Sequence, residues 1–453
     1  MEDLIFVALY CTIPLLVFVL LKSANINLLR FSIPSFVMLN MFVYAYIGIL
    51  PLYFAWDDYR YYGNGVQDKQ IILQVFLASS LTIISMALGM AYFKKWVGGH
   101  TSIRQNFSIR SLKKSEKLFF FSFVVICILA LVLYLKSVPS IALLTAIREG
   151  PLAAKAARST MTNDFSGKYH WYKLFMLDGL FWATFVTFAN SLLTKNQPKQ
   201  KILFYSIFLI TAFSAAASTQ KGPIIKLILA LFIVYTVIKK GGFYPWKKVL
   251  TLATGIFTLL VLMYIRFMGS RDVLSAILSI TSRVFTGQIT PAYWYIEMFP
   301  AYQDFLWGRS FPNPGGIFPF ENYRLTVEVM QFKHPELADL GIVGSAPTVF
   351  WGELYANFGW FSLLFIPFIV GFLLYLMSEL VNKLEDTPLK VGLLVFLGLH
   401  YSDLAGTGLS GFIIDFYLIC IFLIFILISA LSNKGKIRLK KSHLKQIKYK
   451  YYN

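Results

Sequence analysis

Residues 118–136 read LFFFSFVVICILALVLYLK, a run in which the one charged residue, Lys136, comes last. The hydrocarbon core of a membrane is about 30 Å thick, so a helix needs about 20 apolar residues to cross it. The run has that length and that composition. It therefore predicts a membrane-spanning helix, and the fold depends on how often the pattern recurs.

The pattern recurs ten more times along the chain. The whole sequence is 57% hydrophobic and 14% charged, whereas soluble domains carry about 25% charged residues. We therefore expect an all-α polytopic membrane protein with about eleven transmembrane helices, forming a single transmembrane domain over residues 1–453. The predicted spans lie near residues 3–21, 31–55, 70–93, 118–136, 171–193, 202–217, 223–238, 248–265, 358–378, 391–409 and 411–431.

The distribution of charge predicts which helix ends face the cytoplasm. Glu2 and Asp3 precede the first span, which lacks the basic start and the cleavage site of a signal peptide. In multi-pass proteins, cytoplasmic connections are rich in Lys and Arg. An N-terminus outside the cytoplasm places 26 of the 42 basic residues, but four of the 22 acidic ones, in the cytoplasmic segments. These segments are residues 22–30, 94–117, 194–201, 239–248, 379–390 and the basic tail 432–453.

This topology accounts for the whole net charge of +20. Nucleic-acid binding is therefore not needed to explain the basic composition, and we expect none. The basic tail is expected to lie against anionic lipid headgroups.

Two connections on the predicted outer side are long, a medium loop over residues 137–170 and a large loop over residues 266–357. Within them, PSIALLTAIREG (139–150) and DVLSAILSITSRV (272–284) have the apolar spacing of amphipathic helices that lie along the interface. The segment SAPTVFWGELYANFG (345–359) is apolar but short, which favours a re-entrant or half-buried helix. Long loops in a compact fold are usually functional or disordered, and the aromatic content of these two argues against disorder.

Arginine is enriched in the predicted outer regions. Only four of the 26 cytoplasmic basic residues are Arg, against eight of the other 16. Lys suffices to set topology, whereas the planar guanidinium grips phosphate or carboxylate through two parallel hydrogen bonds. The set predicts anion binding, and the alternative is salt bridging to the 18 acidic residues of the same region. The eight are Arg60, Arg148, Arg158, Arg266, Arg271, Arg283, Arg309 and Arg324.

Three further residues are candidates for the site. Lys221 stands in the turn STQKGP before an apolar run, where a helix N-terminus and a cation together suit an anion; the alternative is an interfacial Lys. Glu353 is an acid in an apolar segment, so we expect a raised pKa and the role of a general base; the alternative is a buried ion pair with an Arg. His334 is a candidate proton carrier, or else a surface residue.

Four ionisable residues fall in or near predicted spans: Asp178, His400, Asp403 and Asp415. Ionisable groups inside a membrane are costly, so a functional role is the first hypothesis for them. Here we expect mostly packing and pairing, with Asp403 and Asp415 on the outer side.

The sequence has no P-loop, no dinucleotide-binding fingerprint, no nucleophile elbow and no Cys/His spacing for a metal. We therefore expect no cofactor and no metal site. Any chemistry must use a substrate that arrives already activated.

The order of spans and outer loops resembles that of the O-antigen polymerases, also called oligosaccharide repeat-unit polymerases. Local similarities are STQKGPIIKLILALFIVY (218–235), MYIRFMGSRD (263–272) and FWGELYANFGW (350–360). The resemblance implies a glycosyltransferase of the bacterial inner membrane. Its substrate is an oligosaccharide on undecaprenyl diphosphate at the periplasmic face, and it transfers the growing chain to a hydroxyl of the next repeat unit.

The resemblance also implies roles for the candidate residues. Glu353, Arg266 and Arg271 would act in catalysis, with arginines stabilising the diphosphate leaving group. Aromatic rings would stack on sugars, among them those of Trp294, Tyr295, Phe318 and Tyr323. The expected substrate-binding residues are Arg148, Arg158, Lys221, Arg283, Arg309, Arg324, His334, Trp294 and Tyr323.

Two other functions remain open on the same sequence. One is a ligase that attaches finished glycans to a lipid A core, and the other is a transporter or flippase of lipid-linked sugars. Transporters often have internal repeats, and no two halves of this sequence match. Expected partners are the lipid-linked oligosaccharide and membrane lipids, with a chain-length regulator and a flippase as further candidates.

Overall fold

The structure is a computed structural model that describes residues 1–97, 109–162, 164–165, 167–194, 197–267, 272–336, 344–413 and 415–432. These residues are helical and contain no β-strand, apart from one isolated bridge between Arg30 and Phe243. The predicted all-α class is confirmed.

Nine helices of the described residues are long and apolar enough to cross a membrane. The chain is thus built as a multi-pass membrane protein. The nine are α1 (Glu2–Ser23), α2 with α3 (Ile33–Ala45 and Ile49–Tyr53), α4 (Lys69–Val97), α5 (Lys114–Ser137), α8 with η2 and α9 (Tyr169–Lys173, Leu174–Gly179 and Leu180–Leu193), α10 (Pro198–Ala217), α11 (Lys221–Lys240), α12 (Trp246–Phe267) and α18 (Ser362–Lys383).

The last two predicted spans are shorter than expected. α19 (Pro388–Ser402) has 15 residues and α21 (Phe416–Ser432) has 17. The segment between them, GTGLSG (406–411), has too many glycines to continue a helix. It leads into the short helix α20 (Ser410–Ile413), and Asp415 then caps α21 by accepting a hydrogen bond from Leu418 N at 2.7 Å.

The two long connections contain the helices that the amphipathic spacing predicts, α6 (Ala142–Arg148) and α13 (Val273–Thr281), and the apolar segment before α18 forms α17 (Phe350–Phe358). All residues of α17 except the last are buried. The remaining short elements are η1 (Tyr59–Gly63), α7 (Pro151–Met161), η3 (Ser282–Thr286), α14 (Thr290–Met298), η4 (Pro314–Gly316), α15 (Leu325–Lys333) and η5 (Asp403–Ala405).

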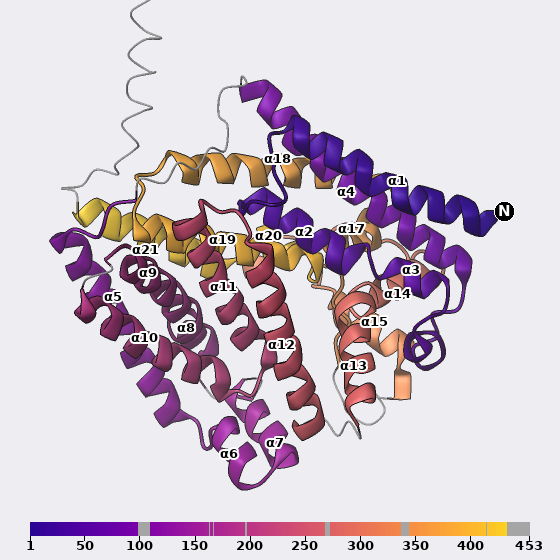
Figure 1. Cartoon of the computed structure of the whole chain (residues 1–453). Helices are drawn as coiled ribbons and strands as arrows, with labels where there is room; N and C mark the ends of the chain where they lie inside the picture. The colour runs from indigo at the N-terminus through magenta and orange to yellow at the C-terminus, as the bar shows by residue number, and fades with distance from the viewer. Residues whose placement is uncertain are drawn as a thin grey trace, which may run out of the picture.

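The helices form two groups with a shared centre (Figure 1). On one side, α1, α4 and α18 pack together, and on the other α5, α9, α10 and α11 do. The backbones of α4 and α18 touch, since a Cβ built on Gly89 would lie 2.0 Å from Phe368 O and one on Gly371 would lie 2.1 Å from Met86 O. Small residues at helix crossings let membrane helices approach this closely.

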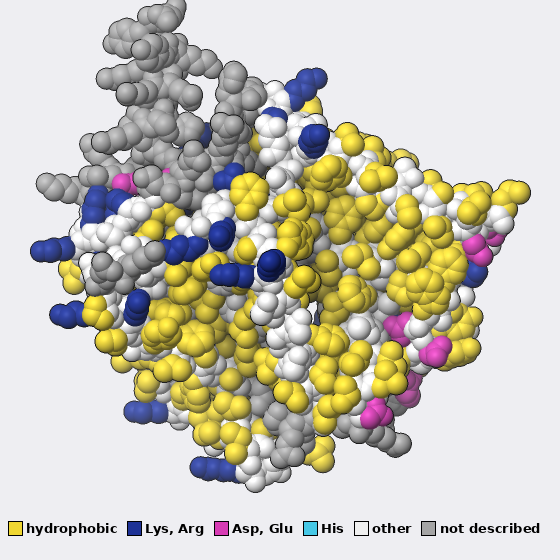
Figure 2. Space-filling view, in the orientation of Figure 1, with side chains coloured by type: hydrophobic (Ala, Val, Ile, Leu, Met, Phe, Trp, Pro, Cys, Tyr) yellow, Lys and Arg dark blue, Asp and Glu magenta, His cyan; other side chains and the backbone are white. Residues whose placement is uncertain are grey.

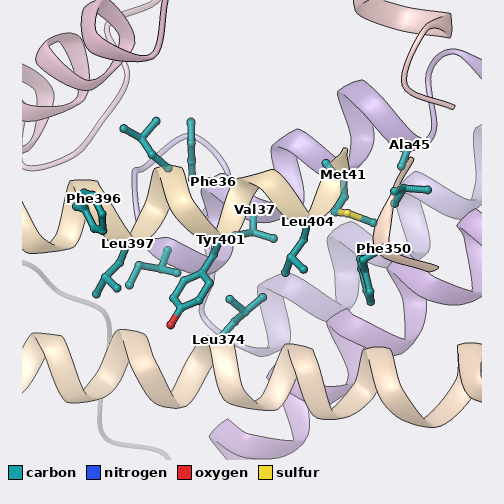
Figure 3. Close-up of a cluster of buried hydrophobic side chains, with 14 of the residues drawn as sticks. Phe36, Val37, Met41, Ala45, Phe350, Leu374, Phe396, Leu397, Tyr401 and Leu404 are labelled. Carbon is teal, nitrogen blue, oxygen red and sulfur yellow. The ribbon is translucent and has the colours of Figure 1, made fainter. Parts of the chain in front are cut away.

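The centre between the two groups is made by α2 and α19. α19 is buried at every residue except His400. Figure 3 shows its apolar side chains against those of α2, with Leu374 of α18 and Phe350 of α17 completing the cluster. A helix that is apolar all round is stable only when protein or lipid covers every face, and here protein covers it.

Contacts between loops divide the bundle into two ends. At one end Phe31 N donates to Gly242 O, Lys94 Nζ to Ser23 O and Lys239 Nζ to Leu192 O. At the same end Arg110 forms ion pairs with Glu116 and Glu385, at 2.5 and 2.8 Å. These residues lie in or next to the segments predicted to be cytoplasmic, so the structure brings those segments together. In Figure 2 most visible Lys and Arg side chains lie at the left and top, and most acidic ones at the right.

Candidate functional site

Two cavities open at the other end of the bundle, next to each other. The first, here called the Glu353 cavity, has a volume of about 380 Å³, and the second, the Asp178 cavity, about 350 Å³. Both are lined by Thr407, which lies in the Gly-rich segment between η5 and α20. The Glu353 cavity is lined by Tyr295, Ser310, Asn322, Tyr323, Arg324, Leu325, Thr326, Val327, Thr348, Glu353, Thr407, Gly408 and Ser410.

Glu353 is held in place by donors from two distant segments. Its Oε2 accepts a hydrogen bond from the backbone N–H of Ser410 at 2.8 Å, and its Oε1 accepts one from the Ser310 hydroxyl at 3.1 Å. The side chain is only 6% exposed. The carboxylate therefore joins the long connection 266–357 to the segment that follows α19.

Asn357, one turn after Glu353 on α17, sets the direction of one of these bonds. Its Nδ2 donates to Ser310 Oγ at 2.7 Å, and its Oδ1 accepts from Gly308 N at 2.9 Å. Because Ser310 accepts from the amide, its own hydroxyl proton is directed to Glu353. Both carboxylate oxygens thus act as acceptors, which is the state of an ionised acid.

Burial raises the pKa of Glu353, and the donors at Ser410 and Ser310 act against that rise. No Lys or Arg of the described residues lies within ion-pair distance of the carboxylate. The alternative of a buried Glu353–Arg pair is therefore wrong within the described chain. A desolvated carboxylate that keeps its lone pairs fixed by neutral donors is suited to accept a proton.

Two of the predicted binding residues lie at the same cavity. Tyr323 and the exposed Arg324 line it from the segment that leads into α15. Arg309 supports this segment, because its carbonyl accepts a hydrogen bond from Tyr323 N at 2.8 Å. The cavity thus combines an acid, a cation and an aromatic ring.

Three cations gather beside η1 and the start of α11, and we call Arg60, Lys221 and Arg283 the basic cluster. Arg60 is buried and donates from Nε to Ser282 Oγ at 3.2 Å. Lys221 Nζ lies 3.9 Å from the ring centroid of Tyr264. Arg283 lies close enough to act electrostatically on both. The cluster brings two predicted residues, Lys221 and Arg283, within electrostatic range of each other.

Burial lowers the pKa of Arg60, the charge of Arg283 acts in the same direction, and Asp57 opposes both. Asp57 is engaged elsewhere as well, since its Oδ2 accepts from Thr286 Oγ1 at 2.6 Å. Like charges held together are relieved by an anion, and guanidinium groups take phosphate bidentately. The sequence included Arg60 among the outer arginines but did not single it out as a binding residue.

A short segment connects the basic cluster to the Glu353 cavity. A Cβ built on Gly287 would lie 3.0 Å from Arg60 Nη2, and one on Gly406 would lie 3.1 Å from Gln288 Oε1. The carbonyl of Gln288 also accepts a hydrogen bond from the Thr348 hydroxyl, which lines the Glu353 cavity, at 2.9 Å. Residues 287 and 288 therefore connect Arg60 of the cluster to Thr348 of the cavity wall.

The other predicted residues are placed elsewhere. Arg148 and Arg158 are exposed on α6 and α7 and line neither cavity. Trp294 is 4% exposed and donates from Nε1 to Asn64 O at 3.3 Å, so its ring belongs to the core and is not open to a sugar. His334 Nδ1 lies 3.1 Å from Glu336 Oε1. The side chain of Arg266 and the whole of Arg271 lie outside the described residues.

Among the residues that the structure describes, no group of three or more His, Cys, Asp or Glu side chains is arranged to hold a metal ion. Comparison with known proteins gave no match to a family model, to a curated protein or to a solved structure. The functional argument therefore depends on the geometry of the site.

Proposed function

We propose that this protein is a membrane glycosyltransferase that polymerises oligosaccharide repeat units carried on undecaprenyl diphosphate, at the periplasmic face of the bacterial inner membrane. The observation that supports this most is the setting of Glu353. A buried carboxylate with neutral donors lines a cavity together with Arg324 and Tyr323, and residues 287 and 288 connect a cluster of cations to the wall of that cavity.

In the proposed reaction, a hydroxyl oxygen of the incoming repeat unit attacks the anomeric carbon of the growing chain. The bond between that carbon and the lipid diphosphate breaks, and the diphosphate leaves with the electron pair. Glu353 takes the proton of the attacking hydroxyl, as a general base does. The substrate supplies its own leaving group, so the step balances without a nucleotide.

The basic cluster is the proposed site for the diphosphate. Positive groups aimed at the leaving oxygens stabilise the charge that develops as the bond breaks. Lys221 begins α11, a helix of 20 residues, and the N-terminus of a helix adds its own partial positive charge. Arg324 at the Glu353 cavity would then hold the part of the substrate nearer the acceptor.

The orientation belongs to the same proposal. The end that joins the basic segments would face the cytoplasm, as the positive-inside rule predicts. The two cavities would then open toward the periplasm, where lipid-linked repeat units are assembled into polymer.

A transporter of lipid-linked sugars is the second candidate. The observation that favours it is the Asp178 cavity, whose walls carry Lys173, Asp178, Lys226, His400, Asp403 and Asp415. Ionisable groups within membrane helices often mark a transport path. Such a protein would move the lipid-linked unit without changing its length.

Deletion of the gene, followed by a gel of surface polysaccharide, tests the proposal. Loss of a polymerase leaves single repeat units attached to the lipid core. Loss of a ligase leaves no attached unit, and lipid-linked chains accumulate. Loss of a transporter leaves unpolymerised units on the cytoplasmic side, which a periplasmic glycosidase cannot reach.

A further inference from the structure

The Asp178 cavity is formed among four helical segments at the side of the bundle that carries Glu353. Its walls come from η2 and α9, from the first turns of α11, from the last turn of α19, and from the start of α21. Leu177, Phe181, Phe185, Phe396 and Leu399 make its apolar walls. The ionisable groups lie among these apolar side chains.

Most charges of this cavity are matched within it. Lys226 Nζ lies 2.7 Å from both carboxylate oxygens of Asp403. His400 Nδ1 lies 3.7 Å from Asp415 Oδ2, and the other oxygen of Asp415 caps α21. The charged groups of these four residues therefore lie in two pairs, Lys226 with Asp403 and His400 with Asp415.

Asp178 is the exception. Its Oδ2 is buried and accepts no hydrogen bond from any described residue. Lys173 and Lys226 are the cations near enough to act on it electrostatically, yet neither is within ion-pair distance, and Asp415 adds a like charge. Lys173 instead holds its Nζ 4.3 Å from the ring centroid of Tyr417. A buried carboxylate oxygen without a donor is costly. Asp178 also lines the cavity, where a ligand can donate hydrogen bonds to its carboxylate.

The side chains of the cavity walls limit the class of ligand that can bind. The described residues have no metal-binding group of side chains, and the walls carry both lysines and aspartates, which suits a neutral ligand that both donates and accepts hydrogen bonds. A sugar offers hydroxyl protons to a carboxylate and hydroxyl oxygens to an ammonium, while its apolar face packs on rings. A volume of about 350 Å³ falls in the usual range of small-ligand sites.

We propose that the Asp178 cavity is a carbohydrate subsite, in which Asp178 accepts and Lys173 donates hydrogen bonds to the hydroxyl groups of one sugar of the lipid-linked oligosaccharide. Thr407 lines both cavities, so the sugar chain would run from this subsite past Thr407 to Glu353. The source of the sugar rests on the proposed function, whereas carbohydrate binding itself does not.

The test is binding of a soluble probe to the full-length protein in detergent. The probe is the oligosaccharide that mild acid releases from the lipid-linked repeat units of the producing cell, and binding is followed by saturation-transfer NMR and titration calorimetry. Asp178→Asn and Lys173→Gln should each weaken binding by about tenfold or more, because a charge-assisted hydrogen bond is lost. Asp304→Asn, at an exposed acid that lines neither cavity, should bind as the wild type does.

Equal binding by the wild type and both cavity variants would overturn the subsite. Normal binding by Asp178→Asn with loss of polymer would also overturn it, and would make Asp178 a proton carrier. A different result would contradict the proposed function without contradicting the subsite. If Glu353→Gln polymerises at the full rate while Asp178→Asn still loses the probe, the subsite stands and the assigned chemistry does not.

Discussion

The carboxylate of Glu353 accepts a hydrogen bond at 2.8 Å from the backbone N–H of Ser410, 57 residues further along the chain. This bond joins α17, at the end of the long connection 266–357, to the first residue of α20. The fit is close on this side, since a Cβ built on Gly408 would lie 2.5 Å from Glu353 Oε2. The position of the proposed base is therefore set by two parts of the chain at once.

Replacing Glu353 by Gln should slow polymerisation by about 10²- to 10⁴-fold, the usual cost of removing a general base. The amide oxygen can still accept a hydrogen bond from Ser410 N, so we expect only a small change in melting temperature. Polymerisation rate and melting temperature are measured on the same purified protein. The control is Glu297→Gln, which breaks the 3.1 Å ion pair with Lys333 but lines neither cavity. Loss of activity together with a collapse of stability in Glu353→Gln would favour a structural role.

Gly408→Ala should displace Glu353, because the added methyl group would overlap Oε2. Overpacking of this kind commonly costs about 1–3 kcal/mol, and we expect activity to fall more steeply than stability. The matched control is Gly255→Ala, since a Cβ at Gly255 on α12 would have no neighbour within 4 Å. Full activity in Gly408→Ala would show that the exact position of Glu353 does not matter to the reaction.

The stability of the protein should depend on pH through Glu353. Burial raises the pKa of Glu353 above its ordinary 4.5, so the folded protein holds the proton more tightly than the unfolded chain does. The resulting stabilisation is fully present below pH 4.5 and is lost as the pH rises through the raised pKa. The melting temperature of the wild type, relative to that of Glu353→Gln, should therefore fall as the pH rises through this window. A difference that does not change with pH would contradict the raised pKa.

Arg60→Lys and Arg283→Lys should weaken the binding of undecaprenyl diphosphate by about tenfold, although each keeps its positive charge. The reason is that Lys lacks the fork that grips two phosphate oxygens at once. Arg158→Lys on α7, which lines neither cavity, serves as the control. Unchanged binding in both cluster variants would show that the basic cluster acts through its positive charge and does not need the guanidinium fork.

The spans were predictable from the sequence because an apolar run of sufficient length is a local property. The amphipathic helices of the two long connections, such as α13, were predictable for the same reason. The ends of α19 and α21 were predicted wrongly, because the glycines of residues 406–411 were read as part of two continuous helices. The glycine-rich segment follows the end of α19 at Ser402, and Asp415 caps the start of α21, so both helices are shorter than hydropathy alone indicates.

The site was predictable only in part. Glu353 stood out as an acid in an apolar run, but its partners Ser310 and Ser410 come from segments that meet only in the folded chain. Trp294 is an aromatic residue of a predicted loop and was therefore predicted to bind a sugar. The sequence does not distinguish a ring that faces the core from one that faces a ligand. Asp178 was expected to be paired, whereas its Oδ2 accepts no hydrogen bond from the described residues.

The most direct test of the account is reconstitution of the purified protein in liposomes with lipid-linked repeat units as the only substrate. We predict a ladder of lipid-linked chains that differ by one repeat unit, with release of undecaprenyl diphosphate in step with each bond formed. Glu353→Gln at the same protein level should give little or no ladder. Single repeat units that remain unjoined in the presence of folded wild-type protein would contradict the central claim.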